Sequence, residues 1–223
     1  MVENLTGQDE PRMPPLERYF KLPETKRNQL LRAARKEFAT HGFERASYNR
    51  IIAATEVSKG AMYYYFADKA DLFGAVIDQL VADVIARVGP PPPAHDADGF
   101  WQSLGAWGMR AAELTFAEPD LSALGRCLYG DSGAQQVVDR VRQQLQAAVI
   151  ETLEHGQTLG AVRDDVPTDM LATGLTHLLL GLDRWFADRL DDLSPADVEH
   201  LSLKTLELCR DLSAPPSVNR ESP

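Results

Sequence analysis

Apolar residues along this chain recur at intervals of three and four positions, which is the spacing of one face of an α-helix. The pattern is clearest in two distant segments, Leu30, Ala33, Ala34 and Phe38 in one, and Val137, Val141, Leu145, Val149 and Leu153 in the other. The strict alternation of apolar and polar residues that marks a strand is not found. The sequence therefore predicts an all-α fold.

Two serines in the first third of the chain suit the N-cap position, where a hydroxyl accepts a hydrogen bond from the first turn. Ser47 predicts a short helix that ends near Ala54, and Ser58 predicts a second one that ends near Phe66. The tight turn Thr55 to Val57 separates them. Two short helices joined in this way predict a helix-turn-helix.

Longer helices flank this unit on both sides. The segment 25–41 has helical periodicity, and Gly42 after it suits a left-handed stop. On the other side Asp68, with Asp71 three residues later, suits the start of a helix that turns its apolar side chains inward. The segment 25–41 and the two short helices thus form a predicted three-helix DNA-binding domain, and the helix that starts at Asp68 leads into the rest of the chain.

Proline marks the internal break between domains. The run Gly89 to His95 holds four consecutive prolines, which cannot continue a helix. We expect a flexible extension over 1–23 and a helix-turn-helix domain over 24–75. We also expect a helical ligand-binding and dimerisation domain over 76–212, and a flexible tail over 213–223.

Charge is unevenly distributed between these parts. The chain has a net charge of -10, which by itself argues against a nucleic-acid partner. Residues 24–75, however, hold nine Lys and Arg against six Asp and Glu, a net charge of +3. A basic amino-terminal unit on an acidic remainder is typical of a DNA-binding protein with a separate second domain.

Several function classes lack support in the sequence. We expect a cytoplasmic protein, because no uncharged apolar run is long enough to span a bilayer and no secretory leader is found. Cys127 and Cys209 belong to no metal or redox motif, although a redox role for Cys127 stays open. The five histidines are scattered, so neither a metal nor a cofactor is expected. No catalytic motif supports an enzyme.

The second short helix of the unit is suited to the major groove, where first-turn residues meet base edges. Lys59 can donate to guanine, Gly60 permits close approach, and Ala61 can touch a thymine methyl group. Tyr63 and Tyr65 can then contact DNA beside them.

The neighbouring residues divide between core and DNA. Met62 and Phe66 are expected in the core, whereas Lys69 adds positive charge at a helix start. For Lys26 and Arg27, as for Arg50, contact with phosphate and simple solvation both stay open.

These residues resemble a known family. The stretches Ile51-Ile52-Ala53, Val57 to Phe66, Asp68-Lys69 and Leu72-Phe73 resemble the TetR signature, and the likeness covers about Thr25 to Ile77. The chain departs from the family at Glu56, where Gly is usual, and at Tyr48, where a small hydroxyl residue is frequent. The resemblance implies DNA contacts at Ser47, Tyr48, Asn49, Lys59, Ala61, Tyr63, Tyr65 and Lys69. It also implies a homodimer whose second domain binds a small molecule and then separates the two reading heads.

Candidate effector-binding residues lie in the second domain, where aromatic side chains and a few polar groups suit an apolar pocket. The candidates are Trp101, Trp107, Arg110, Phe116, His177 and Asp183. For each aromatic residue, a place in the core is the alternative.

The last two helices are candidates for the dimer interface. The segment 171–190 is apolar around much of its circumference, so it is expected to be buried on several sides. With the helix after it, this segment suits half of an intersubunit four-helix bundle, and packing within one chain is the alternative.

We therefore expect a repressor that binds a palindromic operator as a homodimer and is released by a small apolar or aromatic effector. Activation of transcription is not distinguished from repression. A ligand-binding scaffold whose basic head docks on a protein partner is the alternative of another class.

Overall fold

The computed structural model describes residues 17–55, 57–117, 119–130, 134–189 and 192–216, and these residues form helices without a strand. The helices are α1 (Glu17–Phe20), α2 (Glu24–Arg45), α3 (Tyr48–Ala53), α4 (Lys59–Tyr65), α5 (Lys69–Val88), α6 (Ala97–Ala117), α7 (Pro119–Gly130), α8 (Gln135–Thr158), α9 (Thr168–Arg189) and α10 (Pro195–Ser213). The predicted all-α fold is confirmed. None of the helices described is both long and apolar enough to cross a membrane.

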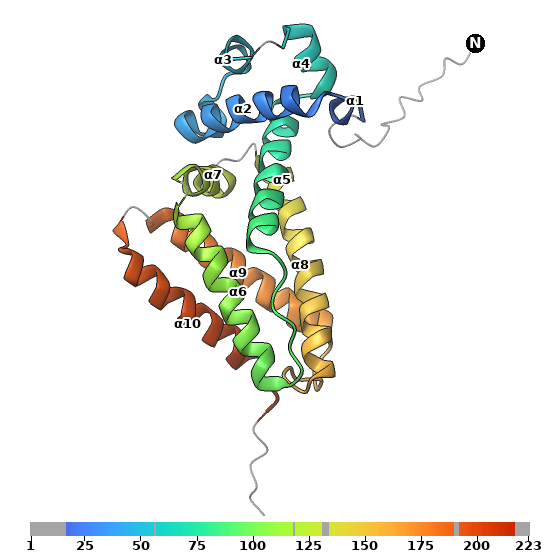
Figure 1. Ribbon diagram of the computed structural model, residues 1–223, viewed down its shortest axis with the longest axis vertical. Helices are drawn as coiled ribbons and strands as arrows, with labels where there is room; N and C mark the ends of the chain where they lie inside the picture. The colour runs from blue at the N-terminus through green and yellow to red at the C-terminus, as the bar shows by residue number, and fades with distance from the viewer. Residues whose placement is uncertain (1–16, 56, 118, 131–133, 190–191, 217–223) are drawn as a thin grey trace, which may run out of the picture.

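Helices α1 to α4 gather at one end of the molecule, and we call them the head (Figure 1). Helix α5 leaves the head and descends beside α8 into a bundle formed by α6 to α10, which we call the body. Helix α2 lies across the top of α5 and also packs on α7. One long helix thus connects the head to the body.

The buried core of the head continues across the predicted domain boundary at residue 75. Phe38 of α2 and Phe73 of α5 meet edge to face with ring centroids 4.9 Å apart. Leu124 and Cys127 of α7 belong to the same apolar cluster. The boundary falls inside α5 because this helix buries residues of both parts along one side.

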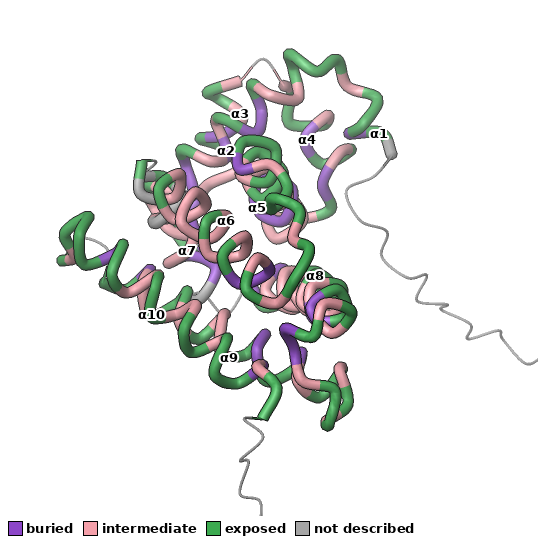
Figure 2. The backbone as a smooth tube through the Cα atoms, turned by 60° about the horizontal axis from the view of Figure 1, so that its bottom comes forward, coloured by how far each residue is buried: buried purple, intermediate pink, exposed green. Residues whose placement is uncertain are grey.

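A second apolar cluster lies farther down the body. Phe100 and Trp101 of α6 pack there with Leu153 of α8 and Leu175 of α9. In the view of burial, α9 and α10 are mostly exposed or half-buried along their length (Figure 2). These outer helices carry exposed large apolar side chains, Met170 on α9 and Leu203, Leu208 and Leu212 on α10.

The ends of the predicted helices differ in detail from the structure. Residues 17–20 form α1 within the extension that the sequence predicted to be flexible, because Tyr19 is buried against the head. Helix α2 runs past its predicted end to Arg45, with a kink at Gly42, whose φ of 72° is in the left-handed region that glycine favours. At the other end of the chain Ser213, placed in the tail, is buried in the last turn of α10.

Candidate nucleic-acid interface

Helices α3 and α4 form the predicted helix-turn-helix, and a serine caps each of them. Ser47 Oγ accepts a hydrogen bond from the backbone N–H of Arg50 at 3.4 Å. Ser58 Oγ accepts one from the N–H of Ala61 at 3.2 Å. These bonds satisfy N–H groups that have no partner within the helix, so both predicted helix starts are confirmed. Glu56 in the turn lies outside the described residues.

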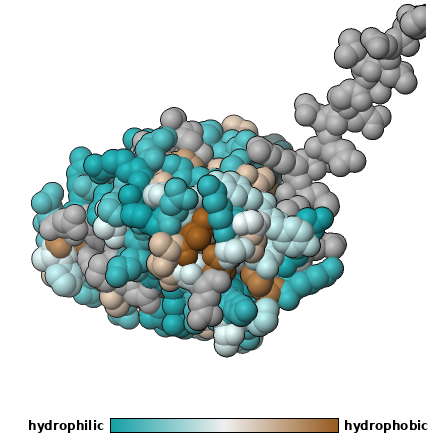
Figure 3. Space-filling model, turned by 90° about the horizontal axis from the view of Figure 1, so that it is seen from above, coloured by the Kyte–Doolittle hydropathy of each residue, from teal (hydrophilic) through white to brown (hydrophobic). Residues whose placement is uncertain are grey.

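Helix α4 is anchored by one side and exposed on the other. Met62 and Phe66 are completely buried, which confirms the core assignment. Lys59 and Gly60 are exposed, and a Cβ atom built on Gly60 would meet nothing within 4 Å. Figure 3 looks down on the head and shows a mainly hydrophilic face around a small apolar patch. The first turn of α4 is therefore open to a macromolecular partner.

Tyr48 and Tyr63 form a pair between α3 and α4. Their rings are stacked, with centroids 5.5 Å apart and planes 26° apart. The hydroxyl of Tyr48 donates to the carbonyl oxygen of Asp68, and burial, together with the nearby carboxylates, raises its pKa. Tyr63 is 54% exposed. The hydroxyl of Tyr48 is thus held inside the protein, and that of Tyr63 is the one open to a phosphate.

The other predicted contact residues take different positions. Asn49 is exposed on the first turn of α3, whereas Tyr65 is half-buried against the core of the head. Lys69 Nζ donates to the carbonyl oxygen of Glu44 at 2.9 Å and lies 4.7 Å above the ring of Phe43. Lys69 therefore joins the start of α5 to the end of α2.

A buried carboxylate that sequence reasoning missed organises the start of α3. Glu37 Oε1 accepts hydrogen bonds from the backbone N–H of Ser47 and from Nε of Arg50, both at 2.8 Å. Burial would raise the pKa of Glu37, but these hydrogen bonds and the charge of Arg50 outweigh it and lower the pKa. Arg50 also donates to the carbonyl oxygen of Arg45 at 2.8 Å. Arg50, which the sequence left open as a phosphate contact, thus holds α3 against α2.

Comparison with known proteins gives the family. The model of bacterial regulatory proteins of the tetR family matches residues 30–76, which include α3 and α4. The HTH-type transcriptional repressor AcnR of Corynebacterium diphtheriae is 30% identical over 168 residues, covering 70% of this chain and 78% of that protein. The chain belongs to the TetR family. It is a helix-turn-helix transcriptional regulator that binds DNA, and it is not an enzyme.

The fold of the whole chain agrees with this assignment. A TetR-family regulator of Syntrophomonas wolfei aligns with a TM-score of 0.67 at 17% identity, over 84% of this chain and 95% of that one. The regulator FadR of Bacillus subtilis aligns with a TM-score of 0.63 at 15% identity, over 82% and 96%. Both the head and the body therefore have the TetR-family architecture.

In this TetR-family chain the predicted effector residues do not share one environment. Trp101 is 7% exposed in the core, and its Nε1 donates to the carbonyl oxygen of Ala161 at 3.3 Å. Trp107 is half-buried, and its Nε1 donates to the carbonyl oxygen of Gly89 at 2.8 Å. Arg110 is half-buried on the same helix.

Two of the remaining three effector candidates are exposed to solvent. His177 and Asp183 are exposed on α9, and Nδ1 of His177 lies 2.8 Å from the carbonyl oxygen of Thr173. The side chain of Phe116 lies outside the described part of the structure. Of the described candidates, Trp107 and Arg110 are the two that are neither buried in the core nor exposed.

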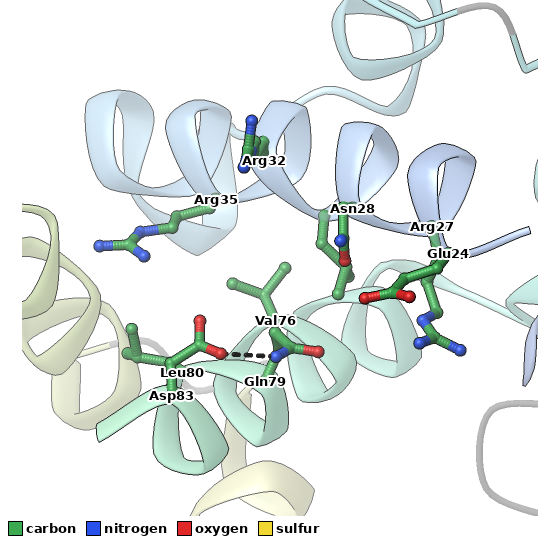
Figure 4. A pocket seen from close by; sticks show the side chains of 10 residues that line it. Glu24, Arg27, Asn28, Arg32, Arg35, Val76, Gln79, Leu80 and Asp83 are labelled. Carbon is green, nitrogen blue, oxygen red and sulfur yellow. Dashed lines mark hydrogen bonds between the residues drawn. The ribbon is translucent and has the colours of Figure 1, made fainter. Parts of the chain in front are cut away.

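A groove of about 420 Å³ lies elsewhere, between α2 and α5 on the side of the head (Figure 4). Arg27 and Arg32 line the groove from α2. Gln79 and Asp83 line it from α5, where Nε2 of Gln79 donates a hydrogen bond to Oδ1 of Asp83 at 2.7 Å. Arg35, which also lines it, lies 3.2 Å from Asp120 of α7, measured between Nε and Oδ2. This groove carries both signs of charge, which is unlike the apolar effector site that the sequence predicts.

Proposed function

We propose that this TetR-family regulator represses transcription by binding a palindromic operator as a homodimer, and that a small apolar or aromatic effector releases it. The observation that carries the proposal is the exposed first turn of α4, where Lys59 and Gly60 stand free above a buried base of Met62 and Phe66. A short helix held in this way can enter the major groove without unfolding. AcnR, which resembles this chain over most of its length, is a transcriptional repressor by name.

The outer face of α9 supports a homodimer. Met170, Gly174, His177 and Gly181 recur at intervals of three and four residues on this face, and Met170 is 68% exposed. A Cβ atom at either glycine would meet nothing within 4 Å, so another helix can approach closely there. We assign His177 to this dimer face in place of the effector site.

Helix α10 adds apolar surface to the same interface. Leu208 and Leu212 are one turn apart on α10 and are 47% and 50% exposed. Packing such leucines against a second copy removes apolar area from water, which favours association. A two-fold dimer presents two copies of α4, which matches a palindromic operator whose half-sites are about one helical turn apart, or a multiple of that.

A buried polar group in the body supports effector binding. Thr176 of α9 is completely buried, and its hydroxyl has no hydrogen-bond partner among the described residues. Buried hydroxyls normally have a partner, so this one is suited to a polar atom of an effector. FadR, which shares the fold, has been crystallised with stearoyl-CoA, a ligand with a long apolar chain. By analogy we propose an apolar effector in the body, with Thr176 as its polar contact and Trp107 and Arg110 of α6 as further candidates.

Selection of bound duplexes from a random DNA pool tests the operator. We expect enrichment of a palindrome that the dimer binds with an affinity falling steeply as salt rises, because phosphate contacts release counterions. Lys59→Ala should bind this duplex about tenfold or more weakly with its dimer intact, since a good base contact is worth about 1–3 kcal/mol. A Lys59→Ala protein that no longer dimerises would show that Lys59 is structural. Binding of the duplex that does not change with salt would favour the alternative, in which the basic head docks on a protein partner.

Displacement from the selected operator tests the effector. Fatty acids, acyl-CoA esters and aromatic acids are suitable probes, with Thr176→Val as the variant. We expect at least one probe class to release the wild-type protein, and Thr176→Val to require more of it. If every probe leaves the operator bound, release by an apolar effector is contradicted.

A further inference from the structure

Helix α1 precedes the residues matched by the family model, yet it packs directly on the DNA-reading helix. Tyr19 is only 3% exposed, and its ring centroid lies 5.0 Å from that of Phe66, at the end of α4. Burial raises the pKa of Tyr19 to about 12, although the charge of Arg27 lowers it in part. Tyr19 belongs to the same apolar cluster as Met62 of α4. The core beneath α4 is therefore completed by a residue of α1.

A second contact from α1 reaches the outer side of α4. The guanidinium carbon of Arg18 lies 4.3 Å from the ring centroid of Tyr64, which is the geometry of a cation–π interaction. Tyr64 is 50% exposed and meets the ring of Tyr65 edge to face, with centroids 5.5 Å apart. Arg18 thus packs on Tyr64, whose side chain lies outside the buried core.

Helix α4 depends on such contacts because it is short. It has seven residues, and a helix of this length is marginal in water without tertiary support. Its first turn is exposed for DNA, so its support comes from its second half, where Met62 and Phe66 face the core. Tyr19 and Arg18 reach this same half from two directions.

We infer that α1 is a positioning element of the DNA-reading site, with Tyr19 and Arg18 holding α4 at the orientation that its base contacts require. The inference rests on DNA reading by α4. Hydrogen bonds to base edges depend strongly on distance and angle, whereas attraction to phosphates does not. Loosening α4 should therefore weaken binding to the operator much more than binding to unrelated DNA.

Arg18→Ala tests the inference, and Lys21→Ala is its matched control, since Lys21 is an exposed cation just after α1. Affinity is measured for the selected operator and for an unrelated duplex over a range of salt, together with the thermal unfolding midpoint. Arg18→Ala should bind the operator about threefold to fivefold more weakly, as expected for loss of an exposed cation–π contact. Its affinity for the unrelated duplex and its salt slope should stay as in the wild type, and its unfolding midpoint should fall by about 2–4 °C at most. Lys21→Ala should match the wild type in every measurement.

Further variants separate positioning from other roles. Arg18→Lys should restore part of the affinity, because an ammonium group also interacts with an aromatic face. Tyr19→Phe, which keeps the ring, should bind like the wild type, whereas Tyr19→Ala should lose both stability and operator affinity.

Three results would overturn the inference. A salt slope shallower by about one for Arg18→Ala would make Arg18 a direct phosphate contact. An equal loss for Lys21→Ala would indicate a general charge effect, and an unchanged affinity for Arg18→Ala would remove α1 from DNA reading. These failures differ from failure of the proposed function, in which the wild-type protein itself enriches no duplex.

Discussion

Arg140 of α8 lies 3.3 Å from Asp78 of α5, measured between Nη2 and Oδ2, so an ion pair connects the body to the helix that carries the head. Burial raises the pKa of Asp78, and the charge of Arg140 offsets this only in part. The guanidinium is seated over Gly74, where an added Cβ atom would come within 2.3 Å of Nη2. A glycine in the middle of α5 is therefore explained by the arginine packed on it.

Gly74→Ala should raise stability only when Arg140 is absent. Alanine favours a helix interior over glycine by about 1 kcal/mol, but in the wild type its methyl group must displace the guanidinium from Asp78. We expect Gly74→Ala to leave the free energy of unfolding unchanged or lower it. In an Arg140→Ala background it should raise that energy by about 1 kcal/mol. Urea unfolding of the four proteins measures this coupling, and strictly additive effects would contradict it.

Tyr48→Phe and Tyr63→Phe should separate folding from DNA binding. Tyr48→Phe removes a hydrogen bond to Asp68 inside the head, so it should cost about 1 kcal/mol of stability and leave operator affinity nearly unchanged. Tyr63→Phe removes an exposed hydroxyl, so stability should stay the same. Its operator affinity should fall about tenfold if that hydroxyl donates to a phosphate, a bond worth about 1.5–3 kcal/mol. Thermal unfolding and operator titration of both variants check this, and swapped effects would refute the assignment.

Glu37→Gln should make the head less stable at neutral pH and less sensitive to acid. The pKa of Glu37 is lowered in the folded protein, so its stabilising contribution is present above the usual pKa range of glutamate. That contribution is lost as the pH falls through the folded-state pKa. We expect Glu37→Gln to lower the free energy of unfolding by about 2 kcal/mol at neutral pH and by less in acid. Urea unfolding across this range, with exposed Glu44→Gln as the control, measures it. A difference that is independent of pH would show that packing alone is lost.

Lys69→Ala should weaken binding to all DNA sequences about equally. If the ammonium group meets a phosphate, the slope of affinity against salt should become shallower by about one. Since Nζ also holds the carbonyl oxygen of Glu44 and covers Phe43, we expect a stability loss of roughly 1 kcal/mol as well. Arg210→Ala, at an exposed position of α10 outside the head, carries the same charge change, and it should alter neither quantity. An unchanged salt slope for Lys69→Ala would leave Lys69 with the structural role only.

The sequence by itself determined the features that depend on local spacing. The helical period, the caps Ser47 and Ser58 and the inward Met62 and Phe66 were all predictable, because each depends on residues within a few positions of one another. The family resemblance was also local, since the signature lies within one helix-turn-helix. Fold class and DNA binding therefore followed from the sequence alone.

Tertiary structure alone decided which polar side chains bind other residues of the chain. Arg50 and Tyr48 both have side chains that can bind phosphate. In the structure Arg50 instead binds Glu37, which is 13 positions away in the sequence, and Tyr48 binds the carbonyl oxygen of Asp68, which is 20 positions away. The sequence predicted that Tyr19 lies in a flexible extension, whereas in the structure its ring packs against Phe66. These contacts join residues that are far apart in the chain, so they form and become buried only when the helices pack together. Periodicity and capping describe one helix at a time, so they carry no information about such partners.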